Sequence, residues 1–159
     1  MTAEPQLAVV AEEPTGESAL VGILMGSESD METMKGAAGE LEKRGIAHEI
    51  NVISAHRQPD QVAEYARSAR SRGLRVLICG AGLSAALPGV VAAHTDLPVI
   101  GVPLSSRLSA AGGLDAILSV LQMPPGVPVA AVGLDNARNA GVLAARIIDS
   151  GGSRPRSVA

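Results

Sequence analysis

Short apolar runs alternate five times with segments of helical periodicity along this chain. The apolar runs cover residues 20–26, 48–54, 75–82, 98–104 and 128–135, and the helical segments cover residues 29–45, 59–73, 84–95, 113–123 and 136–149. This alternation is typical of an open parallel sheet with helices on both faces, in which the strands are apolar along their whole length. The sequence therefore predicts an α/β fold, a three-layer α/β/α sandwich around a parallel sheet.

The two ends of the sequence set the limits of the predicted domain. Residues 1–20 are acidic, contain proline and show no sustained period, and residues 151–159 are polar. We predict flexible tails over both segments. A single domain is then expected over residues 21–150, which is long enough to bury a sizeable core.

Composition excludes several kinds of partner. Aromatic residues make up 1% of the chain and its net charge is -3, so it offers neither stacking faces for single-stranded nucleic acid nor a basic surface for a polyanion. The apolar runs are interrupted well before the roughly 18 residues of a membrane-spanning helix, and the N-terminus lacks the pattern of a signal peptide. The single cysteine cannot form an internal disulfide, which favours a cytoplasmic protein.

Small and polar residues follow the predicted strands, where ligands of such sheets bind. Residues 26–30, GSESD, come after the first strand and open a helix. Ser27, Ser29 or Asp30 could cap that helix. Alternatively, the free N–H groups and serine hydroxyls could bind a phosphate, with Asp30 accepting hydrogen bonds from ribose hydroxyls.

A histidine and an arginine stand side by side where the second predicted strand ends, in the segment VISAHRQPD. The planar guanidinium of Arg57 can bind a phosphate or carboxylate through several hydrogen bonds. His56 can take up and release a proton near neutral pH. Such a pair could be an ordinary surface pair, but its position one strand from the candidate phosphate loop favours a functional role.

The third predicted strand ends in GAGLSA, residues 80–85, which fits the G-x-G-x-x-A pattern of dinucleotide-binding proteins. The pattern comes third along the sheet instead of first, and LPG interrupts the helix that follows. A tight turn and close packing therefore explain the two glycines better than a dinucleotide does.

The remaining histidines and the cysteine show no spacing typical of metal ligands. We expect His48 to be a solvated strand residue and His94 to lie in a loop or at a helix end. Cys79 is expected to be a small apolar residue of a buried strand.

Taken together and in order, the strand-end segments resemble one enzyme family. They are MGSESD, SAHRQPD, GAG…LPG, LPVIGVP, LDAILSVLQMPPGVPVA and NARNAGVLAARI, within about residues 21–149. They are similar to the N5-carboxyaminoimidazole ribonucleotide mutase family of de novo purine synthesis, in its bacterial class I form. The resemblance implies a flavodoxin-like fold, a homo-octamer with sites between subunits, and an isomerase that needs no cofactor: neither metal, ATP nor biotin.

The resemblance also implies a reaction and the residues that carry it. The substrate, a small ribonucleotide, loses its carboxylate from N5 as CO2, which is retained and added to C4. The family's proton-transferring histidine falls on His56, and its ligand-binding positions fall on Ser27, Asp30 and Arg57. The other residues expected to line the site are Ser29, Ser54, Gly80, Gly82 and Ser84.

The chain departs from this family in one loop. Relatives usually read GAGGAAHLPG where this chain reads GAGLSAALPG, so Leu83, Ser84 and Ala86 replace glycine, alanine and histidine. Ala86 leaves open a paralogue that decarboxylates the same substrate, or that carboxylates or decarboxylates a related nucleotide. Animal-type relatives, which carboxylate aminoimidazole ribonucleotide directly, tend to have lysine after the histidine, so Arg57 argues against that class.

A non-enzymatic alternative is a nucleotide-binding regulatory module on the same fold, since fold alone does not determine function. A receiver-like module would need a cluster of acidic residues at the strand ends. Only Asp30 and Asp60 occur there, beside the His56–Arg57 pair, which favours an enzyme.

Overall fold

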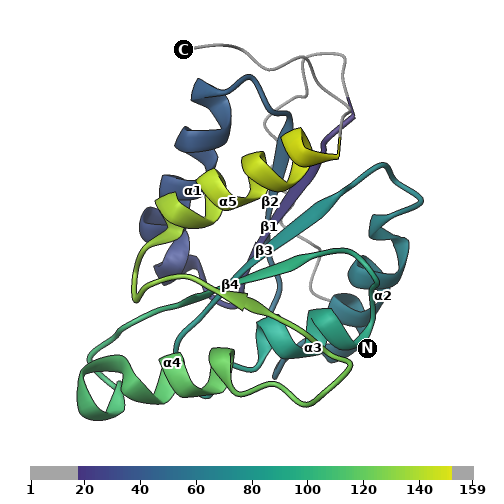
Figure 1. The fold of residues 1–159 in the computed structure, drawn as a ribbon. Helices are drawn as coiled ribbons and strands as arrows, with labels where there is room; N and C mark the ends of the chain where they lie inside the picture. Colours follow the sequence, from purple (N-terminus) through teal and green to yellow (C-terminus); the bar gives the residue numbers. More distant parts are fainter. Residues whose placement is uncertain (1–17, 152–159) are drawn as a thin grey trace, which may run out of the picture.

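The computed structural model describes residues 18–151, in which a five-stranded sheet lies between two layers of helices (Figure 1). The strands are β1 (Val21–Met25), β2 (His48–Val52), β3 (Val76–Ala81), β4 (Val99–Pro103) and β5 (Ala130–Ala131). The helices are α1 (Met31–Lys43), α2 (Pro59–Ala69), α3 (Leu87–Ala93), α4 (Leu114–Leu121) and α5 (Ala137–Ser150), with short 3-10 helices η1 (Glu28–Asp30) and η2 (Ala110–Gly113). Most of the two predicted tails, residues 1–17 and 152–159, lies outside the described residues, and the domain limits stay a prediction.

All neighbouring strands pair in parallel, in the order β2-β1-β3-β4-β5. This order is flavodoxin-like, and it confirms the predicted α/β/α architecture. The direction of strand addition reverses between β1 and β3, which is where ligands of such sheets bind. Met25 pairs with both Val52 and Gly80, so the loops that follow β1, β2 and β3 leave the same edge of the sheet side by side.

Helices cover both faces of the sheet (Figure 1). One apolar cluster lies between the sheet and the helices α1 and α5, and the other lies between the sheet and α2, α3 and α4. Gly141 allows α5 to approach α1 closely, because a Cβ there would lie 2.8 Å from the Ala37 carbonyl oxygen. Cys79 is fully buried, as predicted, and burial raises the pKa of its thiol. Within residues 18–151, no helix is long and apolar enough to cross a membrane.

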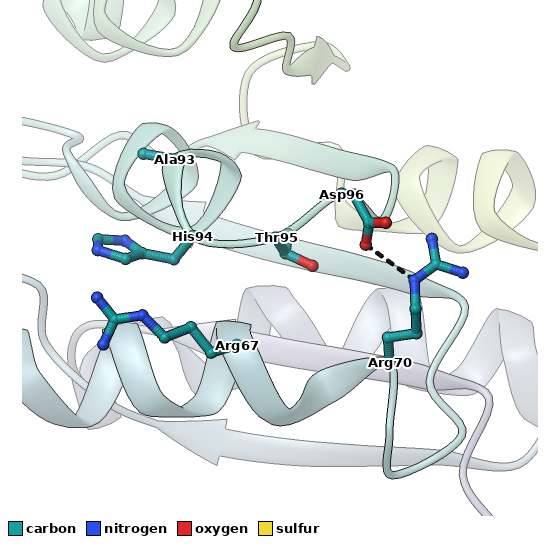
Figure 2. Close-up of a pocket in the computed structure, with 6 residues that line it drawn as sticks. All are labelled: Arg67, Arg70, Ala93, His94, Thr95 and Asp96. Atoms are coloured by element: carbon teal, nitrogen blue, oxygen red, sulfur yellow. Dashed lines mark hydrogen bonds and ion pairs between the residues drawn. The ribbon is translucent and has the colours of Figure 1, made fainter.

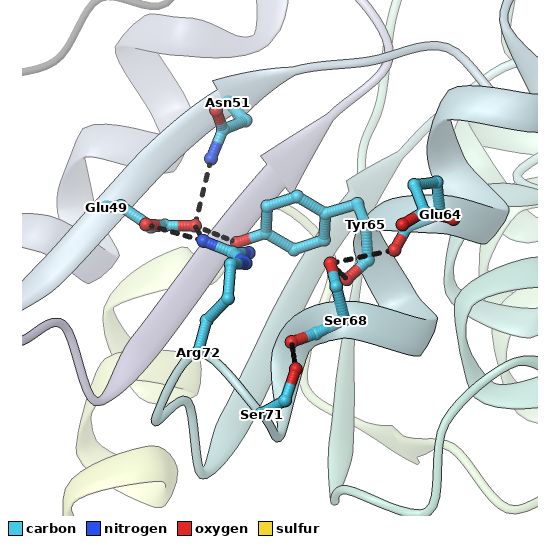
Figure 3. A network of polar contacts seen from close by, with 7 residues as sticks. All are labelled: Glu49, Asn51, Glu64, Tyr65, Ser68, Ser71 and Arg72. Carbon is cyan, nitrogen blue, oxygen red and sulfur yellow. Dashed lines mark hydrogen bonds and ion pairs between the residues drawn. The ribbon is translucent and has the colours of Figure 1, made fainter.

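The single tyrosine of the chain connects α2 to β2, the edge strand (Figure 3). The Tyr65 hydroxyl donates to Glu49 Oε1 at 2.6 Å, and Arg72 Nη1 donates to both oxygens of the same carboxylate at 2.9 and 3.2 Å. Burial, and then the neighbouring Glu49 carboxylate, raise the pKa of Tyr65, so its hydroxyl stays a donor. Gly22 of β1 leaves the space that the hydroxyl occupies. These contacts hold together the two elements that flank the loop carrying His56.

Most predicted elements are longer than the observed ones, and the fifth strand and the third helix have identifiable reasons. The fifth strand, predicted over residues 128–135, is reduced to the two exposed residues of β5 at the edge of the sheet. The third helix begins at Leu87 instead of residue 84, because Ser84 has a φ of 53° and Pro88 occupies the first helical turn.

The expectation that His48 is solvated is wrong. Its side chain is only 11% exposed, and Nδ1 lies 3.1 Å from the Ile46 carbonyl oxygen. The side chain folds back on the turn that enters β2, which the alternating pattern of the strand does not reveal.

Candidate functional site

The loop between β2 and α2 is a compact turn that presents His56 and Arg57. The Ser54 N–H donates to Gln58 Oε1 at 3.3 Å, and the Ser54 carbonyl accepts from the Gln58 N–H at 2.8 Å. The Arg57 N–H donates to Ser54 Oγ at 3.2 Å. His56 and Arg57 lie between these contacts and are exposed, so both side chains are accessible to a ligand.

Arg57 connects this turn to the loop that follows β1. Its Nη2 atom donates to the Gly26 carbonyl oxygen at 2.7 Å. The Ile53 N–H donates to the Met25 carbonyl at 2.8 Å, which extends the pairing of β1 with β2 beyond the end of β2. Two segments that the sequence predicts to carry the site, residues 26–30 and 54–58, are therefore in contact at the point where strand order reverses.

The loop after β1 contains both a helix cap and an unpaired carboxylate. Ser27 caps η1, as one of the two sequence-based interpretations predicts: its Oγ accepts from the Ser29 N–H at 3.3 Å, and the two hydroxyl oxygens are 2.9 Å apart. Asp30 precedes α1, but its carboxylate makes no side-chain hydrogen bond to the described residues. Burial raises the pKa of the Asp30 carboxyl. This partly buried group is available to accept hydrogen bonds from ligand hydroxyls.

The two glycines at the end of β3 are required for close packing. A Cβ on Gly80 would overlap Met34 Sδ and would lie 3.1 Å from Leu104 Cδ1. A Cβ on Gly82 would lie 2.9 Å from the Leu104 backbone oxygen. Packing thus accounts for both glycines, and their predicted place in the lining of a ligand site stays a prediction.

The third loop also carries the residues that depart from the expected family pattern. Ser84 is exposed and adopts a left-handed conformation, with a φ of 53°. Leu83 is 61% exposed, and Ala86 is partly buried just before α3. The Leu83 side chain therefore points largely into solvent.

Two residues of the β2–α2 turn have roles that the sequence did not reveal. Ser54, predicted to contact substrate, is only 6% exposed and its hydroxyl accepts from Arg57 within the turn. Its contact with a ligand stays a prediction. Gln58 was not singled out, because no sequence pattern marks its two contacts with Ser54.

A shallow hollow of about 570 Å³ lies beside the C-terminal ends of α2 and α3, away from the carboxyl ends of the strands (Figure 2). It is lined by Arg67, Arg70, Ala93, His94, Thr95 and Asp96. These residues lie at the C-terminal ends of α2 and α3, where Arg70 Nε donates to Asp96 Oδ1 at 2.8 Å. His94 is the C-cap of α3, as predicted. The hollow therefore contains none of the residues at the strand-end site.

No metal centre is formed by the described part of the chain, where no group of three or more His, Cys, Asp or Glu side chains could hold an ion. The strand ends instead carry an exposed arginine, two serine hydroxyls and a carboxylate. Groups of this kind bind molecules that contain phosphate and hydroxyl groups. Fold and site together define a flavodoxin-like α/β protein with a candidate nucleotide site at its topological switch point.

Comparison with known proteins identifies the family. The sequence profile of the family described as AIR carboxylase matches residues 20–156. The chain belongs to this family.

Two named relatives and one solved structure show how similar this chain is to known proteins. The chain is 55% identical over 132 residues to the N5-carboxyaminoimidazole ribonucleotide mutase of Pyrococcus horikoshii, covering 83% of this chain and 73% of the relative. It is 56% identical over 128 residues to the mutase of Thermotoga maritima, covering 80% and 74%. The crystal structure of Treponema denticola PurE superposes with a TM-score of 0.72 at 36% identity, over 83% of this chain and 81% of that one. These comparisons confirm the resemblance indicated by the strand-end segments.

Proposed function

We propose that this protein is an isomerase that converts N5-carboxyaminoimidazole ribonucleotide to 4-carboxy-5-aminoimidazole ribonucleotide in purine (IMP) biosynthesis. The observation that carries the proposal is the 55–56% identity to relatives named as this mutase, over at least 80% of the chain. The test is incubation of the purified protein with the carboxyamino ribonucleotide, without ATP or added metal, followed by identification of the product.

In the proposed reaction, His56 carries one proton in each direction. The protonated imidazole donates to N5 as the bond between N5 and the carboxylate carbon breaks and CO2 is released into the site. After CO2 has bonded to C4, the neutral imidazole accepts the proton that C4 loses. A group that is donor and then acceptor within one turnover suits a histidine. The exposure of His56 on its turn supports this assignment, because the described residues leave its side chain accessible to a substrate.

The remaining site residues hold the ribonucleotide in this proposal. Arg57 uses one N–H on Gly26 and keeps other donors for the phosphate. The hydroxyls of Ser27 and Ser29 add donors beside it, and the unpaired carboxylate of Asp30 accepts from the ribose hydroxyls. Binding of the remote phosphate then positions the reacting end of the substrate. No cofactor takes part, and we place the protein in the cytoplasm together with its small-molecule substrate.

We further propose that the protein is a homo-octamer. Leu114, Leu118 and Leu121 lie on one side of α4 at the spacing of successive helical turns and are 47%, 45% and 55% exposed. Leu108, which precedes this helix, is 72% exposed. A cluster of large apolar side chains in contact with water favours burial against another subunit.

The octamer is tested by the mass of the protein in solution. Sedimentation equilibrium should give a mass of eight chains, and Leu118→Glu should shift it to smaller species, because a charge would be buried in the interface. The exposed variant Glu64→Gln on α2 is the matched control and should leave the mass unchanged. A wild-type protein that sediments as a monomer would rule out the octamer.

The alanine at position 86 favours partial loss of CO2 from the site. A complete loss would make the protein a decarboxylase of the same substrate, which is the second candidate function. Leu83, which is 61% exposed, offers little buried bulk to replace the histidine that relatives usually carry at position 86. Retention of CO2 depends on a site that excludes water and closes over the fragment. We therefore expect a working but leaky mutase, which releases some free aminoimidazole ribonucleotide in each round of catalysis.

This leak should be reduced by Ala86→His. The measurement uses substrate labelled with ¹³C in the carboxylate and compares labelled C4-carboxylated product with free labelled CO2. The non-enzymatic decarboxylation of the substrate, measured without protein, is subtracted. Only decarboxylated product from the wild type would favour the decarboxylase, and a wild type with no leak above background would contradict the prediction.

A further inference from the structure

Two hydrogen bonds between Ser54 and Gln58 close the turn that carries His56 and Arg57. The backbone of Gln58 donates to the Ser54 carbonyl at 2.8 Å, and its side-chain Oε1 accepts from the Ser54 N–H at 3.3 Å. Ser54 thus has both backbone polar groups paired with one residue, four positions along the chain. We infer that Gln58 is a positioning residue, which fixes the backbone that presents His56 and Arg57 to the substrate.

The Gln58 side chain connects the loop to the first turn of its own helix. Gln58 is the N-cap of α2, with φ -137° and ψ 52°, yet its side chain makes no capping hydrogen bond to that helix. Its Nε2 atom donates to Gln61 Oε1 at 2.9 Å. This contact holds the amide in the orientation that leaves Oε1 facing the Ser54 N–H. The side chain is therefore constrained at both of its polar atoms.

Loss of the Gln58 side-chain oxygen would leave the Ser54 N–H without a hydrogen-bond acceptor. Ser54 is 6% exposed, so water has little access to its N–H, and an unpaired buried donor is unfavourable. His56 makes no side-chain hydrogen bond to the described residues, so no such bond holds its imidazole in place independently of the turn backbone. Arg57 is tied to Gly26 through its side chain, but its own N–H also depends on Ser54. Loosening of the turn therefore displaces the proton-transferring group first.

The expected effect of Gln58 on turnover rests on the proposed function. Two variants of Gln58 test this effect. Gln58→Met keeps the size of the side chain and removes the acceptor, so kcat should fall by about 10-fold or more, since small misplacements of a reacting group are costly. KM should change less, because the phosphate and ribose contacts remain. Gln58→Glu keeps an acceptor oxygen for the Ser54 N–H, so its kcat should stay within about threefold of the wild type. The control is Glu64→Met, which introduces the same methionine at an exposed position of α2 and should leave kcat unchanged.

Amide hydrogen exchange gives a readout that does not require turnover. The Ser54 N–H should exchange slowly in the wild type and in Gln58→Glu. In Gln58→Met its exchange should be faster by more than the fall in global stability, read from the melting temperature, accounts for. Equal losses of kcat in the Met and Glu variants, or unchanged Ser54 exchange in Gln58→Met, would overturn the inference. If the wild type does not convert the ribonucleotide, the proposed function fails, and exchange at Ser54 still decides whether Gln58 fixes the turn.

Discussion

Replacing His56 with asparagine should lower turnover by at least about 10²-fold, the usual loss when a general acid–base group is removed. Asparagine is similar in size and polarity but cannot carry a proton near neutral pH. Because His56 is exposed and makes no side-chain hydrogen bond to residues 18–151, its loss should not disturb the turn that holds it. Binding of the ribonucleotide should therefore persist in the variant.

The measurement is kcat for His56→Asn together with the dissociation constant of the ribonucleotide from calorimetry. His94→Asn is the matched control, since His94 lies at the end of α3, at the opposite edge of the sheet, and its replacement should leave kcat near that of the wild type. Near-native turnover by His56→Asn would show that another group transfers the proton.

Replacing Arg57 with alanine should weaken binding of the ribonucleotide by about 10- to 150-fold, which corresponds to the roughly 1.5–3 kcal/mol of a hydrogen bond to a charged group. Binding of the phosphate-free riboside should change little. The difference between the two ligands isolates the contact with the phosphate, and calorimetry with both ligands measures it.

The structure gives Arg57 a second role that this experiment separates from the first. Its Nη2 atom donates to the Gly26 carbonyl, so alanine also removes a link between the two site loops. If that link were the main contribution of Arg57, the riboside and the ribonucleotide would lose affinity equally. Such a result would contradict a direct contact between Arg57 and the phosphate.

The fold could be predicted from the sequence because its central strands are apolar on both faces. Every residue of β1, β3 and β4 is buried. The pattern fails at the edge of the sheet. Ala130–Ala131 pair only with β4 and are exposed, so the apolar residues around them do not form a longer strand.

The contact between the two predicted loops could also be predicted from the sequence, whereas the hydrogen bonds within them could not. Parallel strands bring their carboxyl ends to one edge, which is enough to place residues 26–30 beside His56 and Arg57. The closure of the turn by Gln58 depends on backbone dihedral angles and on one side-chain rotamer, and neither has a sequence pattern of its own. For the same reason the burial of Ser54 inside the turn could not be predicted, and its contact with a ligand stays a prediction.

The central claim is that this chain moves a carboxylate from nitrogen to carbon on one ribonucleotide. The most direct test follows ¹³C-carboxylate-labelled N5-carboxyaminoimidazole ribonucleotide by NMR, with purified protein and a chelator and without ATP. We predict that the labelled carbon appears bonded to C4 faster than in the absence of protein, and that His56→Asn abolishes this gain. Formation of free aminoimidazole ribonucleotide and labelled CO2 alone, or no change from the rate without protein, would contradict the account.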